Sequence, residues 1–142
     1  MAKRLTARRS VTIDAEPVTI WSALTDPEQV SKAFFGARVD TDWQEGSPIT
    51  FSGEWNGKPF RDHGEVVRVE PGSTLTFTHF SPLSGQPDTP ENYHTVTFEL
   101  TPRNGATEVT ISQTNAASEE EKQHSEENWA QVLNTIKQLA ER

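Results

Sequence analysis

The chain has 142 residues and a formal net charge of −8, and it contains no cysteine. This length fits one domain, and the missing cysteines exclude disulfides, zinc–thiolate sites, iron–sulfur clusters and thiol nucleophiles. Leu, Ile, Val and Phe together supply only 29 residues, a fraction close to that of disordered chains. These residues nevertheless fall in periodic strings, so we expect a single folded domain over residues 1–142, with a very polar surface or a hollow core.

Composition also excludes two classes of partner. No apolar run approaches the roughly 20 residues of a membrane span, and no apolar stretch follows the basic residues near the N-terminus. We therefore expect no membrane association and no signal peptide. An acidic chain lacks the clustered Lys and Arg that bind nucleic-acid phosphates, and we interpret the basic first ten residues as a solvated strand edge. The prediction is a cytoplasmic protein that binds no nucleic acid.

The first part of the chain predicts one strand followed by two short helices. Apolar and polar side chains alternate over residues 9–15, as in a half-buried strand. Pro17 is typical of a first helical turn, and apolar residues follow it at helical spacing. The Asp26-Pro27 pair ends this helix and begins a second one, which Gly36 terminates.

The middle of the chain predicts antiparallel strands. The candidate segments are residues 38–43, 49–55, 60–70, 74–80, 93–101 and 108–113. Asn-Gly pairs at 56–57 and 104–105 are strong hairpin signals. Apolar residues alternate with threonines along several of these segments, which is typical of a sheet with one covered face.

Residues 118–142 contain neither Pro nor Gly and predict one long helix. Ser118 and Glu121 form a capping box at its start, and its apolar stripe begins only at Trp129. Because residues 119–128 carry no large apolar side chain, we expect the C-terminal half of the helix to fix it to the core. Its first turns should cover a polar region or an open space.

The order of one strand, two short helices, about six strands and one long helix predicts an α+β fold. Antiparallel strands need a layer over their apolar face, and only one long helix is available to form it. We therefore expect a curved antiparallel sheet of about six to seven strands wrapped around the C-terminal helix, with a space between the two layers.

Segments along most of the chain resemble the START-like (SRPBCC) superfamily, whose helix-grip fold is also that of the birch-pollen-allergen proteins. They are IDAEPV (13–18) and WSALTDPE (21–28), GEV (64–66) to VEP (69–71) with LTFT (75–78), VTFELTP (96–102), TEVT (107–110), and Asn128-Trp129 to Leu133. More closely, they resemble the group named after activators of the heat-shock chaperone ATPase. The resemblance implies a hydrophobic ligand cavity between sheet and long helix. It implies no single reaction, since members include chaperone activators, lipid carriers and cyclases.

Two histidines are the main polar candidates. Alternation places His79 on the apolar face of the 74–80 strand and His94 on that of the 93–101 strand. If these strands pair, the two imidazoles face each other on the cavity side, and Glu65 would lie beside His79. Ordinary hydrogen bonding, contact with a ligand and acid–base chemistry all remain open for this set. Two histidines and one carboxylate are a weak signal for a metal, so we predict no metal site.

The candidate ligand-binding residues are Trp129, Phe77, Phe98 and Leu75 as cavity walls, with His79, His94, Tyr93, Trp55 and Asn128. Trp129 fits either packed core or a ligand platform, and His124, Ser125 and Asn128 fit either a solvated helix face or the cavity's polar rim. The connection at 81–92 contains three prolines and is long enough to be functional. We interpret it as an ordered lid at the cavity mouth, with a surface loop as the alternative.

Three functions from different classes fit these features. The first is binding of an apolar or aromatic small molecule or a lipid. The second is a chaperone-ATPase-activator-like interaction module, which needs an exposed apolar patch. The third is a cyclase- or hydratase-type enzyme that uses His79 or His94, although glycine-rich phosphate loops, nucleophile elbows and HExxH motifs are absent from the sequence. We favour the first, with no cofactor and with the chain as a monomer or weak homodimer.

Overall fold

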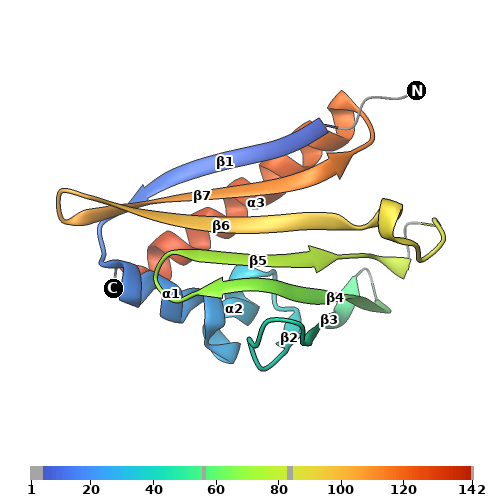
Figure 1. Cartoon of the computed structure of the whole chain (residues 1–142), viewed down its shortest axis with the longest axis horizontal. Coiled ribbons are helices and arrows are strands. Elements are labelled where there is room, and N and C mark those ends of the chain that lie inside the picture. Colours follow the sequence, from blue (N-terminus) through green and yellow to red (C-terminus); the bar gives the residue numbers. More distant parts are fainter. Residues whose placement is uncertain (1–4, 56, 83–84, 142) are drawn as a thin grey trace.

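The computed structural model describes residues 5–55, 57–82 and 85–141. Within them, seven strands form one antiparallel sheet in the order β1-β7-β6-β5-β4-β3-β2 (Figure 1). The strands are β1 Leu5–Ile13, β2 Arg38–Asp40, β3 Pro48–Trp55, β4 Lys58–Glu70, β5 Thr74–His79, β6 His94–Arg103 and β7 Ala106–Ala116. The helices are α1 Pro17–Thr25, α2 Pro27–Ala33, the 3-10 helix η2 Pro90–Asn92 and α3 Glu119–Ala140.

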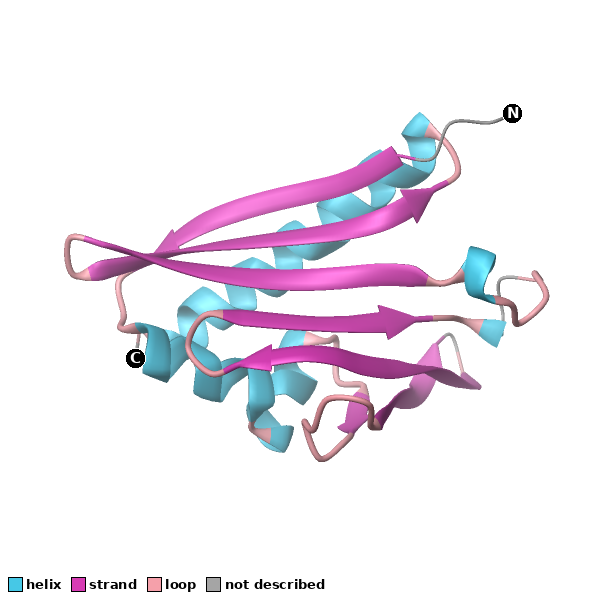
Figure 2. Ribbon diagram, viewed as in Figure 1, coloured by secondary structure: helices cyan, strands magenta, loops and turns pink. Residues whose placement is uncertain are grey.

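The predicted helix-grip architecture is confirmed. The long helix α3 crosses one face of the sheet, and α1 and α2 lie near its C-terminal end (Figure 2). The two edge strands of the sheet, β1 and β2, both contact this helical layer, β1 through α3 and β2 through α2. Since both edges reach helices on the same side, the sheet curves around them.

The helices begin where local signals predict, whereas α2 ends at Ala33, three residues before the predicted terminator Gly36. Asp26 ends α1 and caps α2, where its carboxylate accepts a hydrogen bond from the Glu28 N–H at 3.3 Å. At the start of α3, Ser118 Oγ accepts from the Glu121 N–H at 3.1 Å, and the Glu121 carboxylate accepts from the Ala117 N–H. These contacts satisfy backbone donors that have no partner within a helix.

The hairpin turns set the register of the sheet. Asn104 and Gly105 connect β6 to β7 with φ angles of 50° and 87°. Two consecutive positive φ angles are what a type I′ turn requires, and Asn-Gly adopts them readily. The other predicted turn, at 56–57, connects β3 to β4, but Asn56 itself lies outside the described residues.

Several strands differ in length from the prediction; β1, for example, runs from Leu5 to Ile13 instead of over residues 9–15. β2 ends at Asp40, before Trp43, because the chain turns there: Trp43 has a φ of 58°, and its indole N–H donates to the Thr25 carbonyl at 3.0 Å. This bond fixes the following loop to α1 instead of to the sheet. β7 continues to Ala116, past the predicted end, because β1 pairs with it along the extension.

The packed core lies under the C-terminal half of α3. The buried residues of α3 are Val132, Leu133, Ile136 and Ala140. Residues 119–128 of the same helix include no fully buried side chain, as predicted. The helix is therefore fixed at one end, and its other end stands over the part of the sheet where the candidate site lies.

At Gly64 the backbone of β5 occupies the place that a side chain would need. A Cβ at this position would lie 1.7 Å from the Thr78 carbonyl oxygen, a backbone atom that cannot move aside alone. We predict that Gly64→Ala lowers the free energy of unfolding by about 2–3 kcal/mol, the upper part of the usual range for overpacking. Urea denaturation measures this change.

Gly53→Ala is the matched control. A Cβ there would meet the Phe60 ring at 3.2 Å and Ala37 Cα at 3.7 Å. The second distance is an ordinary van der Waals contact, and the Phe60 side chain can shift with little strain. The control should therefore lose much less stability than Gly64→Ala. Equal losses in the two variants would contradict the assignment of close backbone contact to Gly64.

Candidate functional site

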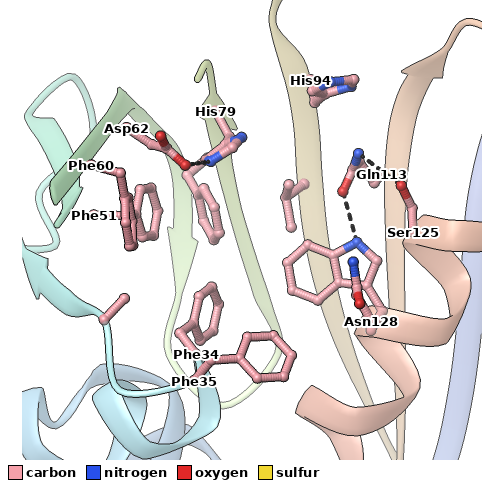
Figure 3. A pocket seen from close by; sticks show the side chains of 14 residues that line it. Phe34, Phe35, Phe51, Phe60, Asp62, His79, His94, Gln113, Ser125 and Asn128 are labelled. Atoms are coloured by element: carbon pink, nitrogen blue, oxygen red, sulfur yellow. Dashed lines mark hydrogen bonds and ion pairs between the residues drawn. The ribbon is translucent and has the colours of Figure 1, made fainter. Parts of the chain in front are cut away.

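A pocket of about 330 Å³ lies between the N-terminal half of α3 and strands β3 to β7. This volume is at the lower end of the range for small-molecule sites. Figure 3 shows aromatic rings such as Phe34 and Phe35 toward one end and the side chains of Asp62, His79 and His94 toward the other. The pocket therefore has an apolar end and a polar end.

The apolar wall is a continuous series of rings. The Phe51 ring on β3 lies 5.5 Å from Phe77 and 5.4 Å from His79, between centroids. On its other side Phe51 stacks on Phe34 at 5.9 Å, and Phe34 meets Trp129 of α3 edge-on at 5.8 Å. Stacked and edge-on contacts stabilise such a series beyond simple burial, so the wall joins the sheet to α3.

Phe35 lies at the mouth of the pocket. Its side chain is 60% exposed, and its φ of 58° is in the left-handed region, which is unfavourable for a bulky residue. It directly follows Phe34, the C-cap of α2, at a position where glycine is common. An exposed aromatic ring in a strained conformation is typical of a ligand site rather than of a structural loop.

At the polar end, Asp62 on β4 accepts a hydrogen bond from His79 on β5. The Oδ2–Nε2 distance is 2.9 Å, and the side chains are 16% and 30% exposed. Because an ionised carboxylate only accepts, Nε2 carries the proton and Nδ1 of the neutral ring is an acceptor. The other carboxylate oxygen, Asp62 Oδ1, is buried and has no hydrogen-bond partner among the described residues.

His94 on β6 is the register partner of His79, which confirms the predicted pairing, and both residues line the pocket. His94 Nδ1 lies 2.8 Å from the Thr114 carbonyl oxygen. A carbonyl only accepts, so Nδ1 donates and Nε2 of the neutral ring is left as an acceptor. Each imidazole is thus held by its own partner.

The predicted place of Glu65 beside His79 is wrong. Val66 pairs with Phe77, and both side chains are buried on the inner face. Side chains alternate along a strand, so Glu65 lies on the outer face, where it is exposed. Asp62, three residues earlier on the same strand, is the carboxylate that reaches His79.

Trp129 both packs in the core and lines the pocket. Its ring meets Phe98 edge-on at 6.0 Å, and its indole N–H donates to Gln113 Oε1 at 2.7 Å. Gln113 Nε2 lies 3.5 Å from Ser125 Oγ. Ser125 and Asn128 complete the α3 side of the pocket, in line with the polar-rim alternative for these two residues.

Several predicted site residues lie elsewhere. Leu75 and Phe98 are each 1% exposed, because they are farther along the sheet, where the core closes. Tyr93 precedes His94 and therefore lies on the outer face. Trp55 belongs to β3, but its side chain lies outside the described part of the structure. Five predicted residues do line the pocket: Trp129, Phe77, His79, His94 and Asn128.

Sequence reasoning missed several pocket residues. These are Phe34, Phe35, Ala37, Phe51, Phe60, Asp62, Val96 and Gln113. Most stand on elements that were predicted, but their convergence depends on the curvature of the sheet. The one local signal was Phe-Phe-Gly at 34–36, an aromatic pair directly before a helix-terminating glycine.

The connection between β5 and β6 adjoins a second, more polar cavity of about 190 Å³. Ser81, Gln86 and Asn92 line this cavity together with His79 and His94. The two histidines therefore lie between the two cavities. The described residues of the connection do not include any that line the larger pocket, and its role as a lid stays a prediction.

Contacts on the outer face hold this connection in place. The Tyr93 hydroxyl donates to Asp88 Oδ1 at 2.5 Å, and Asp88 Oδ2 lies 3.2 Å from His63 Nε2. The Tyr93 ring also stacks on Phe80, with 5.1 Å between centroids. The hydrogen bond to Asp88 raises the pKa of Tyr93 to about 12.

Residues 14–141 match the model of the family described as "Activator of Hsp90 ATPase homolog 1-like protein". The chain belongs to this family. The match covers the helices and all strands that form the pocket, so the family fold and the candidate site coincide. Among the curated proteins, none matches this chain.

Solved structures support the same assignment. The solution structure of ChR145 from Cytophaga hutchinsonii is 42% identical over 97% of this chain and 94% of that chain, with a TM-score of 0.83. The Aha1 dimer from Colwellia psychrerythraea, 21% identical over 96% of each chain, has a TM-score of 0.75. Ara h 8.0201 is 13% identical over 97% of this chain and 98% of that chain, with a TM-score of 0.77. At these identities the last two show that the helix-grip fold is shared.

Two features are absent from the part of the chain that the structure describes. Of the helices that the structure describes, none combines the length and the apolar character that crossing a membrane requires. In the same residues, no three His, Asp or Glu side chains gather closely enough to hold a metal ion.

Tyr93 is the chain's single tyrosine, so an absorbance titration of phenolate reports on it alone. We predict a midpoint of about 12, because the neutral phenol donates a hydrogen bond to Asp88 and the charge of Asp88 repels the phenolate. Asp88→Asn should return the midpoint toward the ordinary value of about 10. Since the folded-state pKa lies above the unfolded value, this contribution to stability is complete below about pH 10 and is lost as the pH rises through the folded-state value. A midpoint near 10 in both proteins would contradict the described anchoring.

Proposed function

We propose that this protein binds a small apolar or aromatic molecule in the pocket between α3 and the sheet. The observation that carries the proposal is the continuous wall of rings from Phe77 through Phe51 and Phe34 to Trp129. These rings line a pocket of about 330 Å³, so they do not pack together into a filled core. The pocket volume suits a molecule of one or two rings better than a long lipid chain.

The free energy of burial and of ring contacts favours an aromatic occupant. Apolar surface removed from water contributes about 25 cal/mol per Å², and ring-to-ring contacts add roughly 0.5–1.5 kcal/mol each. Phe35 at the mouth is 60% exposed and gains most from such contact, because it is the pocket ring most open to water. A flat aromatic molecule would cover it.

The family name describes an activator of a chaperone ATPase, which is the alternative partner. Such a partner requires a contiguous apolar surface. Among the described residues, the large exposed hydrophobic side chains are Val18, Phe35 and Val67, and they belong to three different parts of the fold. The observed surface therefore supports a small-molecule occupant more directly than a docked protein.

Titration with naphthalene tests the proposal by NMR. The indole N–H of Trp129 lies in the pocket, bonded to Gln113, whereas that of Trp43 is bonded to the Thr25 carbonyl outside it. We expect the Trp129 indole resonance to shift and saturate while the Trp43 resonance stays in place. Equal, unsaturated shifts of both resonances would contradict binding in the pocket.

A blocking variant sharpens this test. Ser125→Phe places a ring in the pocket from α3 and should abolish the saturable shift. Gln123→Phe adds the same ring at an exposed position of the same helix and should leave binding unchanged. Loss of binding in both variants would point to a general effect on α3 and not to the pocket.

Phe35→Asn should separate binding from stability. Asn tolerates the left-handed backbone that costs other residues roughly 1–2 kcal/mol, so the free energy of unfolding should stay unchanged or rise by about 1 kcal/mol. Naphthalene affinity should fall about two- to tenfold through the lost ring contact. Urea denaturation and the NMR titration measure the two quantities.

Phe34→Ala is the contrasting variant. Phe34 is half-buried in the ring wall and has an ordinary negative φ of −97°, so this variant should lose both stability and affinity. A marked loss of stability in Phe35→Asn would contradict the view that Phe35 is retained for binding.

A further inference from the structure

The polar end of the pocket offers hydrogen-bond acceptors. Within the described part of the chain, the Asp62 carboxylate receives one hydrogen bond, from His79, although an ionised carboxylate has about four acceptor positions. His79 Nδ1 and His94 Nε2 are also acceptors in the neutral rings, because the opposite nitrogen of each ring donates. All three groups line the same pocket.

The described lining of the pocket includes no Lys or Arg. Gln113, on β7, directs one of its two amide N–H donors to Ser125 of α3. The amide of Asn128, also on α3, is exposed. With a carboxylate in the pocket and a net charge of −8 on the chain, the local field opposes an anionic occupant.

Asp62 Oδ1 indicates what is missing from this set. It is buried without a hydrogen-bond partner among the described residues, and an unpaired buried acceptor of this kind is unfavourable. A partial rotation of the carboxylate group toward the pocket would let a donor on an occupant reach Oδ1 while Oδ2 keeps the hydrogen bond from His79. The side chain of Asp62 is 16% exposed, which leaves it within reach from the pocket.

We propose that the occupant of this pocket is an aromatic molecule with a hydrogen-bond donor, an O–H or N–H group, that bonds to the Asp62–His79 pair, and that carboxylates are rejected. This inference rests on the proposed function, since it specifies the chemistry of the occupant. The rings of the occupant lie against the wall near Phe51. Its donor group then meets His79, whose ring centroid is 5.4 Å from that of Phe51.

Four naphthalene probes test the proposal by calorimetry at neutral pH. They are 2-naphthol, which donates, 2-methoxynaphthalene, which only accepts, naphthalene itself, and the anion 2-naphthoate. We expect 2-naphthol to bind at least about tenfold more tightly than 2-methoxynaphthalene, the usual effect of a hydrogen bond to a charged group. The anion 2-naphthoate should bind more weakly than naphthalene.

Asp62→Asn changes the chemistry of this position with little change of shape. The Asn oxygen can accept from His79, which directs the amide N–H₂ toward the pocket and replaces an acceptor with a donor. The preference for 2-naphthol over 2-methoxynaphthalene should fall to within about twofold, and 2-naphthoate should gain affinity. Naphthalene binding should persist, which shows that the variant is folded.

Glu65→Gln is the matched control. It removes the same charge from the same strand, but Glu65 is exposed on the outer face. Its probe preferences should equal those of the unmodified protein. If they change as they do in Asp62→Asn, net charge and not the contact with Asp62 sets the preference, and the proposal is wrong.

The outcomes separate this inference from the proposed function. If naphthalene and 2-methoxynaphthalene bind and 2-naphthol binds no more tightly, the donor preference is overturned while the pocket remains a binding site. If none of the four probes binds, the proposed function fails and the inference fails with it. A tenfold preference that survives in Asp62→Asn would also overturn the assignment to Asp62.

Discussion

The rest of the structure depends on how unevenly α3 is fixed to the sheet. Its buried residues all fall between Val132 and Ala140, and the turns before Trp129 carry mostly polar side chains. Apolar contact drives the sheet onto the C-terminal half of the helix only. The edge strands complete the layer by contacting α3 and α2, and the N-terminal half of α3 consequently stands over a space that aromatic rings border without filling.

Much of this arrangement could be predicted because it follows from local patterns. The capping box at Ser118, the Asn104-Gly105 turn and the late start of the apolar stripe in α3 each act within a few residues, and each appears as expected. The pairing of His79 with His94 was also predictable, since a slip of one residue would expose the apolar face of both strands. The rings that converge on the pocket from α2, β3 and β4 were not, because their meeting depends on the curvature of the whole sheet.

The partner of His79 shows where such reasoning stops. The β4–β5 pair includes an irregularity between Val66 and Arg68, and a bulge of this kind changes which residues face inward. The sequence carries no clear sign of its position. A carboxylate was expected beside His79, and one is present, but Asp62 supplies it instead of Glu65. The prediction was therefore right about the kind of group beside His79 and wrong about which residue supplies it.

Three features of this pocket are unfavourable for folding, and they occur together. Phe35 is exposed and has a left-handed backbone, Asp62 Oδ1 is buried without a partner in the described structure, and one half of α3 contributes little to the core. Natural proteins are only marginally stable, so such features are costly. One substitution, or a small number of substitutions, could remove each of them. Strain and unpaired polar groups that gather in one place, while local signals elsewhere agree with the fold, are the pattern expected where a ligand supplies the missing contacts. Under our proposal the rings and the acceptors belong to one site, because an aromatic donor would pack against the ring wall and pair with Asp62.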